Sequence, residues 1–276
     1  MEFAPSTYYA GKSRKRSDRD LRHDDLKLKI KQVFEESGSR YGARKVHFEL
    51  LRQDVVVGRD QVAVLMKELG LKGITAPKKK KVVTTVSNIN DKRPLDLLNR
   101  DFTANAPNTK WVADITYVLV NKTFLYVAFV IDVYSRMIVG WSISRSLKTN
   151  LPLQALEMAI SLRDISDDLI HHSDRGSQYL SLTYSERLEE VGITASVGSK
   201  GDSYDNALAE ATNNLYKREV IFHEGPFFTT SELEKATASW VHWFNTKRLH
   251  SACGFIPPSE FEKNYYTDLN KGNKVA

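Results

Sequence analysis

The sequence contains a single cysteine, Cys253, so it forms no internal disulfide and offers too few thiolates for a cysteine-based zinc site. It has no run of about 18 apolar residues, which excludes a membrane-spanning helix. The first residues also lack the apolar stretch of a secretory signal peptide. A reducing compartment and no membrane are therefore expected.

Several catalytic signatures are missing as well. Neither the G-x-S-x-G nucleophile elbow of a serine hydrolase nor a P-loop is present. The 12 tyrosines are not accompanied by the Arg/His-x-x-Arg constellation of a tyrosine recombinase. These three classes of enzyme are set aside.

Positive charge is concentrated in the first third of the chain. Residues 1–93 hold 22 Lys and Arg against 12 Asp and Glu, whereas the remainder holds 18 against 22. Clustered basic charge is typical of a protein that binds a polyanion, most often nucleic acid, and the alternative is a solvated basic arm. The 276 residues, 41% of them hydrophobic, suffice for one large or two smaller domains.

The first domain is predicted to be small and helical. Apolar residues recur at helical spacing in three short segments separated by turns that contain glycine, an arrangement typical of a helix-turn-helix module. We expect helices at 26–36, 43–52 and 60–69, after an irregular start over 1–23, within a DNA-binding domain 1–76.

A linker is expected at 77–107, because its first half shows no sustained period. Four consecutive basic residues there either grip phosphates or form a solvated tether: Lys78, Lys79, Lys80 and Lys81.

The second domain is predicted to be α/β. Three short segments rich in β-branched and aromatic residues follow one another closely, which favours an antiparallel meander. Helices and strands then alternate, which indicates a mixed sheet flanked by helices. The strands are expected at 111–120, 124–133, 136–144, 169–172 and 193–197. The helices are expected at 151–162, 182–191, from about residue 205, and at 231–245, within a domain 108–264 that ends in a tail 265–276.

Three acidic residues in this domain stand where chemistry is expected. Asp114 interrupts an apolar strand, where a carboxylate costs free energy unless it is paired, solvated or bound to metal. Asp174 follows a strand end and precedes a glycine turn, a common ligand position, although a turn-forming aspartate is the alternative. Glu210 shares the polar face of a helix with Asn206, Asn214 and Lys217.

Two further acids near that helix are expected to be structural: Asp205 as an N-cap and Glu219 on the surface. Two aspartates and a glutamate from three elements suit Mg²⁺ or Mn²⁺, which prefer carboxylate oxygens. A pair of such ions catalyses phosphoryl transfer.

The chain resembles the OrfB transposases of the bacterial insertion-sequence-3 family, whose cores are similar to retroviral integrase. The resemblance covers nearly the whole chain, and Asp174 and Glu210 are separated by 35 residues, as in the family's D,D(35)E signature. Lys217, seven residues after Glu210, matches a basic residue of the family. The motifs that carry the resemblance are PSTYY (5–9), YGARKV (41–46), WVADITYV (111–118), YVAFVIDVYSRMIVGW (126–141), HHSDRGSQY (171–179), GSKGDSYDNALAEATNNLYKREVI (198–221) and WFNTKRLHSACGFIPPSEF (243–261).

The resemblance implies an RNase H-like fold with Asp114, Asp174 and Glu210 as catalytic residues that bind two Mg²⁺ ions, for which Mn²⁺ substitutes. Such an enzyme cleaves insertion-sequence ends, and the freed 3′-hydroxyl attacks a second phosphodiester. The implied partners are end and target DNA, further copies of the chain and an upstream OrfA-type protein or fusion, in the bacterial cytoplasm at the nucleoid.

The same resemblance implies roles for four more residues. Lys217 and Asn214 are expected to contact DNA, whereas Arg248 and His250 either pack or contact the DNA backbone. The family usually carries serine and then aromatic residues after the glutamate, but this chain has Ala211 to Asn214. The alternatives are a non-catalytic DNA-binding relative and a metal-dependent RNase H-type nuclease.

Overall fold

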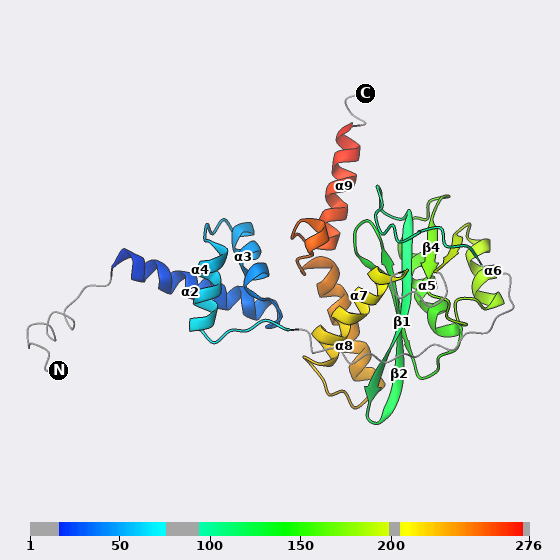
Figure 1. The fold of residues 1–276 in the computed structure, drawn as a ribbon, viewed down its shortest axis with the longest axis horizontal. Coiled ribbons are helices and arrows are strands. Elements are labelled where there is room, and N and C mark those ends of the chain that lie inside the picture. Colours follow the sequence, from blue (N-terminus) through cyan, green and yellow to red (C-terminus); the bar gives the residue numbers. More distant parts are fainter. Residues whose placement is uncertain (1–16, 76–93, 199–204, 273–276) are drawn as a thin grey trace, which may run out of the picture. The chain divides into compact units, whose positions relative to one another are not determined.

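The computed structural model describes residues 17–75, 94–198 and 205–272, and the chain divides into two compact units, residues 1–74 and 75–276 (Figure 1). The expected fold class is confirmed: a small helical unit precedes a mixed sheet flanked by helices. None of the helices in the described ranges is long and apolar enough to cross a membrane.

Unit 1 consists of α2 (Asp18–Glu36), α3 (Ala43–Arg52) and α4 (Arg59–Glu68). The expected irregular start over 1–23 is wrong from Ser17 onward. The Ser17 side chain accepts from the Asp20 backbone N–H, and the Asp20 side chain accepts from the Ser17 N–H, so this capping box starts the helix early. Apolar residues from all three helices then form the core of the unit: Leu26, Ile30, Val33, Phe34, Val46, Leu50, Val62, Leu65 and Met66.

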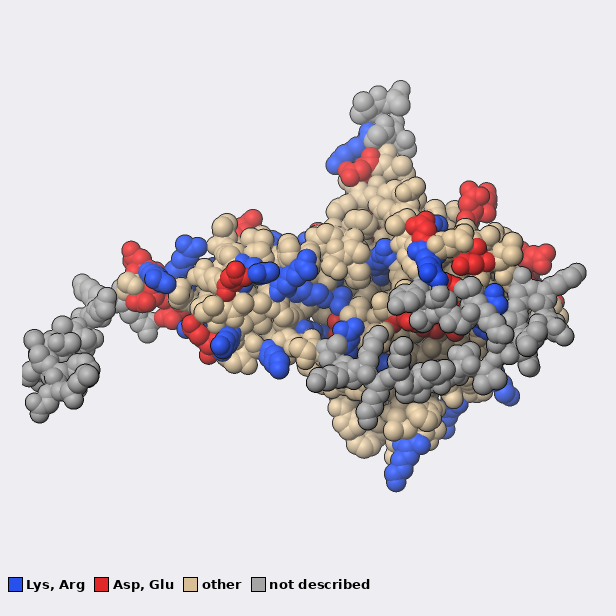
Figure 2. All heavy atoms as spheres, in the orientation of Figure 1, with Lys and Arg blue, Asp and Glu red and all other residues tan. Residues whose placement is uncertain are grey.

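The described part of unit 1 is close to neutral. Residues 17–75 hold 12 Lys and Arg against 10 Asp and Glu, and the two signs are interspersed on the face drawn in Figure 2. Most of the basic excess of the first 93 residues therefore belongs to segments outside the described residues, among them the run Lys78–Lys81.

Unit 2 is built on a five-stranded sheet of order β3-β2-β1-β4-β5. The first three strands pair antiparallel as the expected meander, and β4 and β5 add to β1 in parallel. The strands are β1 (Lys110–Val120), β2 (Thr123–Asp132), β3 (Ile138–Ser144), β4 (Ile170–Ser173) and β5 (Thr194–Val197).

Helices cover both faces of this sheet, as Figure 1 shows. One face packs against α7 (Ala207–Tyr216) and α8 (Thr230–Thr246) through an aromatic cluster of Phe129, Tyr216 and Trp240. The other face packs against α5 (Asn150–Leu162) and α6 (Leu182–Glu190). Burial on both faces explains why β1, β2 and β3 are mostly apolar.

The two ends of unit 2 differ from expectation. Residues 94–107, expected to belong to the linker, pack on the sheet: Leu98 is buried in the core, and the Val197 N–H donates to the Leu95 carbonyl at 3.2 Å. At the other end, α9 (Pro258–Gly272) continues as a helix through most of the predicted tail 265–276. Pro258 at its first position is compatible with helix initiation, because the missing N–H would have no partner there.

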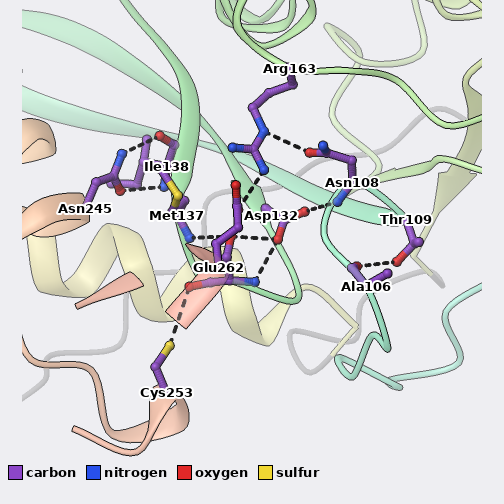
Figure 3. A network of polar contacts seen from close by, with 11 residues as sticks. Ala106, Asn108, Thr109, Asp132, Met137, Ile138, Arg163, Asn245, Cys253 and Glu262 are labelled. Carbon is purple, nitrogen blue, oxygen red and sulfur yellow. Dashed lines mark hydrogen bonds and ion pairs between the residues drawn. The ribbon is translucent and has the colours of Figure 1, made fainter. Parts of the chain in front are cut away.

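A buried polar network ties α9 to the sheet (Figure 3). Asp132 is fully buried, and its carboxylate accepts bonds from the backbone N–H groups of Asn108 and Ser135 at 2.7 Å each. The Arg163 guanidinium donates to the Asn108 side chain at 2.9 Å and to Glu262 of α9 at 2.7 Å. This network fixes the loop before β1 and the C-terminal helix to the same strand end.

A second buried ion pair corrects the expectation that Glu219 lies on the surface. After α7 the chain continues as a π-helical turn (Lys217–Ile221), which buries the Glu219 side chain. Its carboxylate accepts from the guanidinium of Arg248 at 2.7 to 3.0 Å and from the indole N–H of Trp240 at 3.0 Å. The Arg248 side chain is only 6% exposed and lies over the Phe244 ring.

We expect Arg248→Met to lower the free energy of unfolding of the full-length chain by about 3–5 kcal/mol, because it leaves the Glu219 carboxylate buried without its cation. Chemical denaturation measures the loss. The matched control is Arg187→Met, which breaks the more exposed ion pairs with Glu157 and Glu190 and should cost about 1 kcal/mol or less. Equal losses in the two variants would contradict the structural role of Arg248.

Candidate catalytic and metal site

The register between β1 and β4 brings two of the predicted acids together. Ala113 on β1 is paired with Ser173, the last residue of β4, and the parallel pairing stops there. Asp114 and Asp174 are the next residues along the two segments, and neighbouring strands lie about 4.8 Å apart. The two aspartates therefore stand on adjacent segments at the point where the pairing of β1 with β4 ends.

The third acid, Glu210, belongs to α7, and the start of this helix is hydrogen-bonded to β1 next to Asp114. The Asn206 side chain donates to the Ala113 carbonyl at 2.9 Å, and the Glu210 N–H bonds to the Asn206 carbonyl one turn later. Further along the helix, the Asn213 side chain donates to the Asp114 carboxylate at 2.8 Å. Glu210 lies between these two anchors and is half-buried.

Asn213 is the residue that sequence reasoning missed. The sequence does contain a signal for it, because Asn213 follows Asn206 by seven residues, close to two full turns of 3.6 residues. It therefore lies nearer the centre of the polar face than Asn214 does. Asn213 also belongs to the stretch Ala211 to Asn214 that departs from the family pattern. The structure shows that the departure includes a contact with Asp114.

Charge repulsion marks this site. Burial, then the neighbouring charges of Asp174 and Glu210, raise the pKa of Asp114 to about 8, although hydrogen bonds from Ile115 and Asn213 oppose the shift. Asp174 is exposed by surface area, yet the protein atoms around its carboxylate still raise its pKa. The charges of Asp174 and Glu210 thus both act on Asp114, and a cation bound among the three carboxylates would relieve that repulsion.

The oxygen atoms gathered at this site are of the chemical type that binds a hard divalent cation. Besides the three carboxylates, the side-chain carbonyl oxygens of Asn206 and Asn213 are buried and have no hydrogen-bond partner, which is costly unless something else binds them. Carboxylate and amide oxygens are suitable ligands for Mg²⁺ and Mn²⁺. Among the residues that the structure describes, no three acidic, histidine or cysteine side chains already form a closed ligand set. Binding a cation would therefore require the carboxylates to draw together.

Lys217 is a predicted DNA contact whose pKa is influenced by one of the acids, Asp114. Its ammonium group stands over the Tyr117 ring at 4.4 Å. Burial lowers the pKa of Lys217, and the charge of Asp114 opposes that shift. Asn214 is half-buried, and its backbone carbonyl accepts a bond from Arg218 at 3.0 Å.

The remaining candidates lie elsewhere. Arg248 is buried against Glu219, and the His250 ring accepts from the Ala252 N–H and packs on Phe244. These contacts favour packing over DNA contact for both residues. The run Lys78–Lys81 lies outside the described residues.

The N-cap expectation for Asp205 is wrong. Asn206 occupies the N-cap position of α7 and makes no side-chain capping bond. The Asp205 carboxylate instead accepts from the Arg100 guanidinium at 2.8 Å. A partner 105 positions away in the chain cannot be identified from local helix signals.

Comparison with known proteins covers the whole chain. Residues 104–203 and 191–258 each match a family described as "Integrase core domain", and residues 21–80 match one described as "HTH-like domain". The chain is 47% identical to the "Putative transposase for insertion sequence element IS986/IS6110" of Mycobacterium tuberculosis (strain CDC 1551 / Oshkosh), over 98% of this chain and 99% of that protein. It is 46% identical to the "Transposase for insertion sequence element IS629" of Shigella sonnei, over 100% of this chain and 93% of that protein.

Among solved structures, the chain resembles one in the simian T-cell lymphotropic virus intasome in complex with the PP2A regulatory subunit B56 gamma. The TM-score is 0.51 at 17% identity, over 63% of this chain and 60% of that one. At this identity the likeness concerns the fold alone.

A pH dependence follows from the position of Asp114. Because its pKa is raised from 3.8 to about 8 in the folded chain, the folded state binds this proton more tightly than the unfolded state does. In metal-free buffer the carboxyl therefore contributes stability that is present below about pH 4 and is lost as the pH rises to about 8.

We expect Asp114→Asn, which stays neutral, to remove this contribution. Urea unfolding in EDTA at pH 5 and at pH 8 should show a smaller fall in unfolding free energy for the variant than for the wild type. Parallel pH profiles for the two proteins would show that Asp114 is not held in this environment.

Proposed function

Because the chain belongs to the integrase-core transposases of bacterial insertion sequences, we propose that Asp114, Asp174 and Glu210 form its catalytic, metal-binding site. The enzyme cleaves DNA at the ends of its element and joins the freed 3′-hydroxyl to a phosphodiester of the target. The observation that carries the assignment is the β1–β4 register, which ends at Ala113 and Ser173 immediately before the two aspartates.

The proposed cofactor is a pair of Mg²⁺ ions, for which Mn²⁺ substitutes. When bound, such ions activate the attacking oxygen and stabilise the leaving oxygen. The three carboxylates would hold them, and Asn213 would orient the Asp114 carboxylate through its 2.8 Å hydrogen bond. Partners of metal ligands typically contribute 10- to 100-fold to metal affinity or activity.

We assign the nearest basic contact with the reacting DNA to Lys217. Its side chain is half-buried and its ammonium group stands over the Tyr117 ring, so the ammonium has lost part of its hydration before DNA arrives. A phosphate there would supply the anion that a partly desolvated ammonium lacks. Asn214, on the edge of the same polar face, is the proposed second contact.

Unit 1 and the basic segments next to it in the sequence are proposed to bind DNA as a region separate from the catalytic acids. The folded helices of unit 1 match a helix-turn-helix-like family. Residues 17–75 are nearly neutral, whereas the run Lys78–Lys81 adds four positive charges beyond them. We propose that these lysines bind phosphates and that several copies of the chain act together, because two ends of one element must be held for transposition.

We expect Asp174→Asn and Glu210→Gln each to reduce Mg²⁺-dependent cleavage and joining of duplex oligonucleotides that carry the element ends to about one-hundredth or less, since loss of a ligand should cost at least as much as loss of its partner. DNA affinity measured in EDTA should be retained.

Glu234→Gln, an exposed glutamate of α8, is the matched control and should keep full activity. Cleavage at the wild-type rate in either site variant would refute the assignment of the acids. Cleavage of RNA–DNA hybrids without any joining of DNA would support the metal-dependent nuclease instead.

A further inference from the structure

The start of α7 is held by a set of polar contacts, most of them buried, that the proposed chemistry does not itself require. We call the set Arg100, His172, Ser196, Asp205 and Asn206 the α7 joint. Asp205 and Asn206 are both 4% exposed, and they stand immediately before the first residue of the helix. Contacts made at this point decide where the helix begins and how it is turned.

Hydrogen-bond chemistry fixes the direction of one chain through the joint. The His172 Nε2 atom lies 2.8 Å from the Asp205 carbonyl oxygen, which only accepts, so Nε2 carries the proton. In the neutral ring, Nδ1 then accepts from the Ser196 hydroxyl at 2.8 Å. The Ser196 oxygen accepts in turn from the Leu97 backbone N–H at 2.9 Å. Donors and acceptors thus match at every step from Leu97 to Asp205.

Arg100 bonds to Asp205 from the solvent-exposed side. Its Nε donates to the Asp205 carboxylate at 2.8 Å; the Arg100 side chain is 54% exposed, whereas that of Asp205 is 5% exposed. The chain at Gly198 also passes close to Asp205, because a Cβ added at Gly198 would lie 3.0 Å from the Asp205 Cβ. Asp205 is therefore hydrogen-bonded on two sides. Its carbonyl is bonded to His172 of β4, and its carboxylate is bonded to Arg100 of the segment before β1.

These contacts bear on the catalytic acids by a short route. His172 lies two residues before Asp174, and Asn206 donates to the carbonyl of Ala113, the residue before Asp114. The Glu210 N–H bonds to the Asn206 carbonyl. The residues immediately before α7 are thus bonded to the two strands that lead into the two aspartates, one turn ahead of Glu210.

We infer that Arg100 and His172 are positioning residues that set where Glu210 stands relative to Asp114 and Asp174. The segment 94–100, which follows the connection between the two units, thereby becomes part of the catalytic apparatus without touching DNA or metal. The inference rests on the proposed function, because it concerns the placement of the proposed third ligand.

The test uses Arg100, whose exposed side chain can be changed without opening the core. In the metal-free, full-length protein we expect Arg100→Ala to raise the hydrogen-exchange rate of the amides from Glu210 to Thr212 by at least about ten-fold, the factor expected for losing a hydrogen bond to a charged group. Amides of β2 should exchange as in the wild type. Arg145→Ala, which removes an exposed arginine bonded only weakly to Thr230 at 3.5 Å, is the matched control.

Activity supplies the second readout. With Mg²⁺, which demands near-ideal octahedral geometry, Arg100→Ala should join element-end duplexes between about ten and a hundred times more slowly than the wild type. Mn²⁺, which tolerates poorer geometry, should recover most of that loss, and Arg100→Lys should recover part of it with Mg²⁺. Affinity for the duplex should be unchanged.

Three results would overturn the inference. One is exchange in α7 of Arg100→Ala that equals that of Arg145→Ala. Another is an equal loss of activity with Mg²⁺ and Mn²⁺, and the third is a defect that appears only as weaker DNA binding and disappears at saturating DNA. Failure of the proposed function would give a different result. The wild type itself would then show no metal-dependent joining, while hydrogen exchange would still show whether Arg100 stabilises the start of α7.

Discussion

The parallel pairing of β1 with β4 ends at Ala113 and Ser173, and the placement of the acids depends on where it ends. Asp114 is still paired with Phe129 of β2, so only its β4 side is left open where this ladder stops. The Ala113 carbonyl at this end is taken by the Asn206 side chain, so the same point also fixes the start of α7. A single register thus places side chains from three elements.

This arrangement places Asp114 among protein atoms that shield it from water, close to Glu210 and to the more exposed Asp174. Burial and the two neighbouring acids raise the pKa of Asp114, and the amide oxygens of Asn206 and Asn213 remain without a donor. A well-packed fold tolerates such groups only at a cost, which is usual at sites that bind ions or perform chemistry. The free energy comes from elsewhere in unit 2, where the aromatic cluster around Trp240 and the Glu219–Arg248 pair hold α7 and α8 on the sheet.

Local pattern was sufficient to predict most of the fold. β-branched and aromatic runs placed the first three strands to within two residues at either end, because these strands are apolar on both faces. The Ser17–Asp20 capping box and Pro258 are local signals of a helix start that the spacing of apolar residues does not contain. By contrast, Glu219 and Asp205 were misjudged for a reason that no local pattern contains. Their partners, Arg248 and Arg100, lie 29 and 105 positions away, and the π-helical turn after α7 alters the helical phase on which the surface prediction for Glu219 relied. Asn213 was readable from helical phase, but its contact with Asp114 depends on how α7 lies across β1.

The central claim is that Asp114, Asp174 and Glu210 converge on bound metal when DNA is present. Diffraction from crystals of the full-length chain bound to an element-end duplex and soaked in Mn²⁺, recorded at an energy where manganese scatters anomalously, tests it most directly. We predict anomalous peaks bounded by carboxylate oxygens of all three acids, next to a DNA phosphate. Peaks that lie elsewhere, or a Glu210 carboxylate that points away from the metal in the DNA-bound complex, would contradict the account.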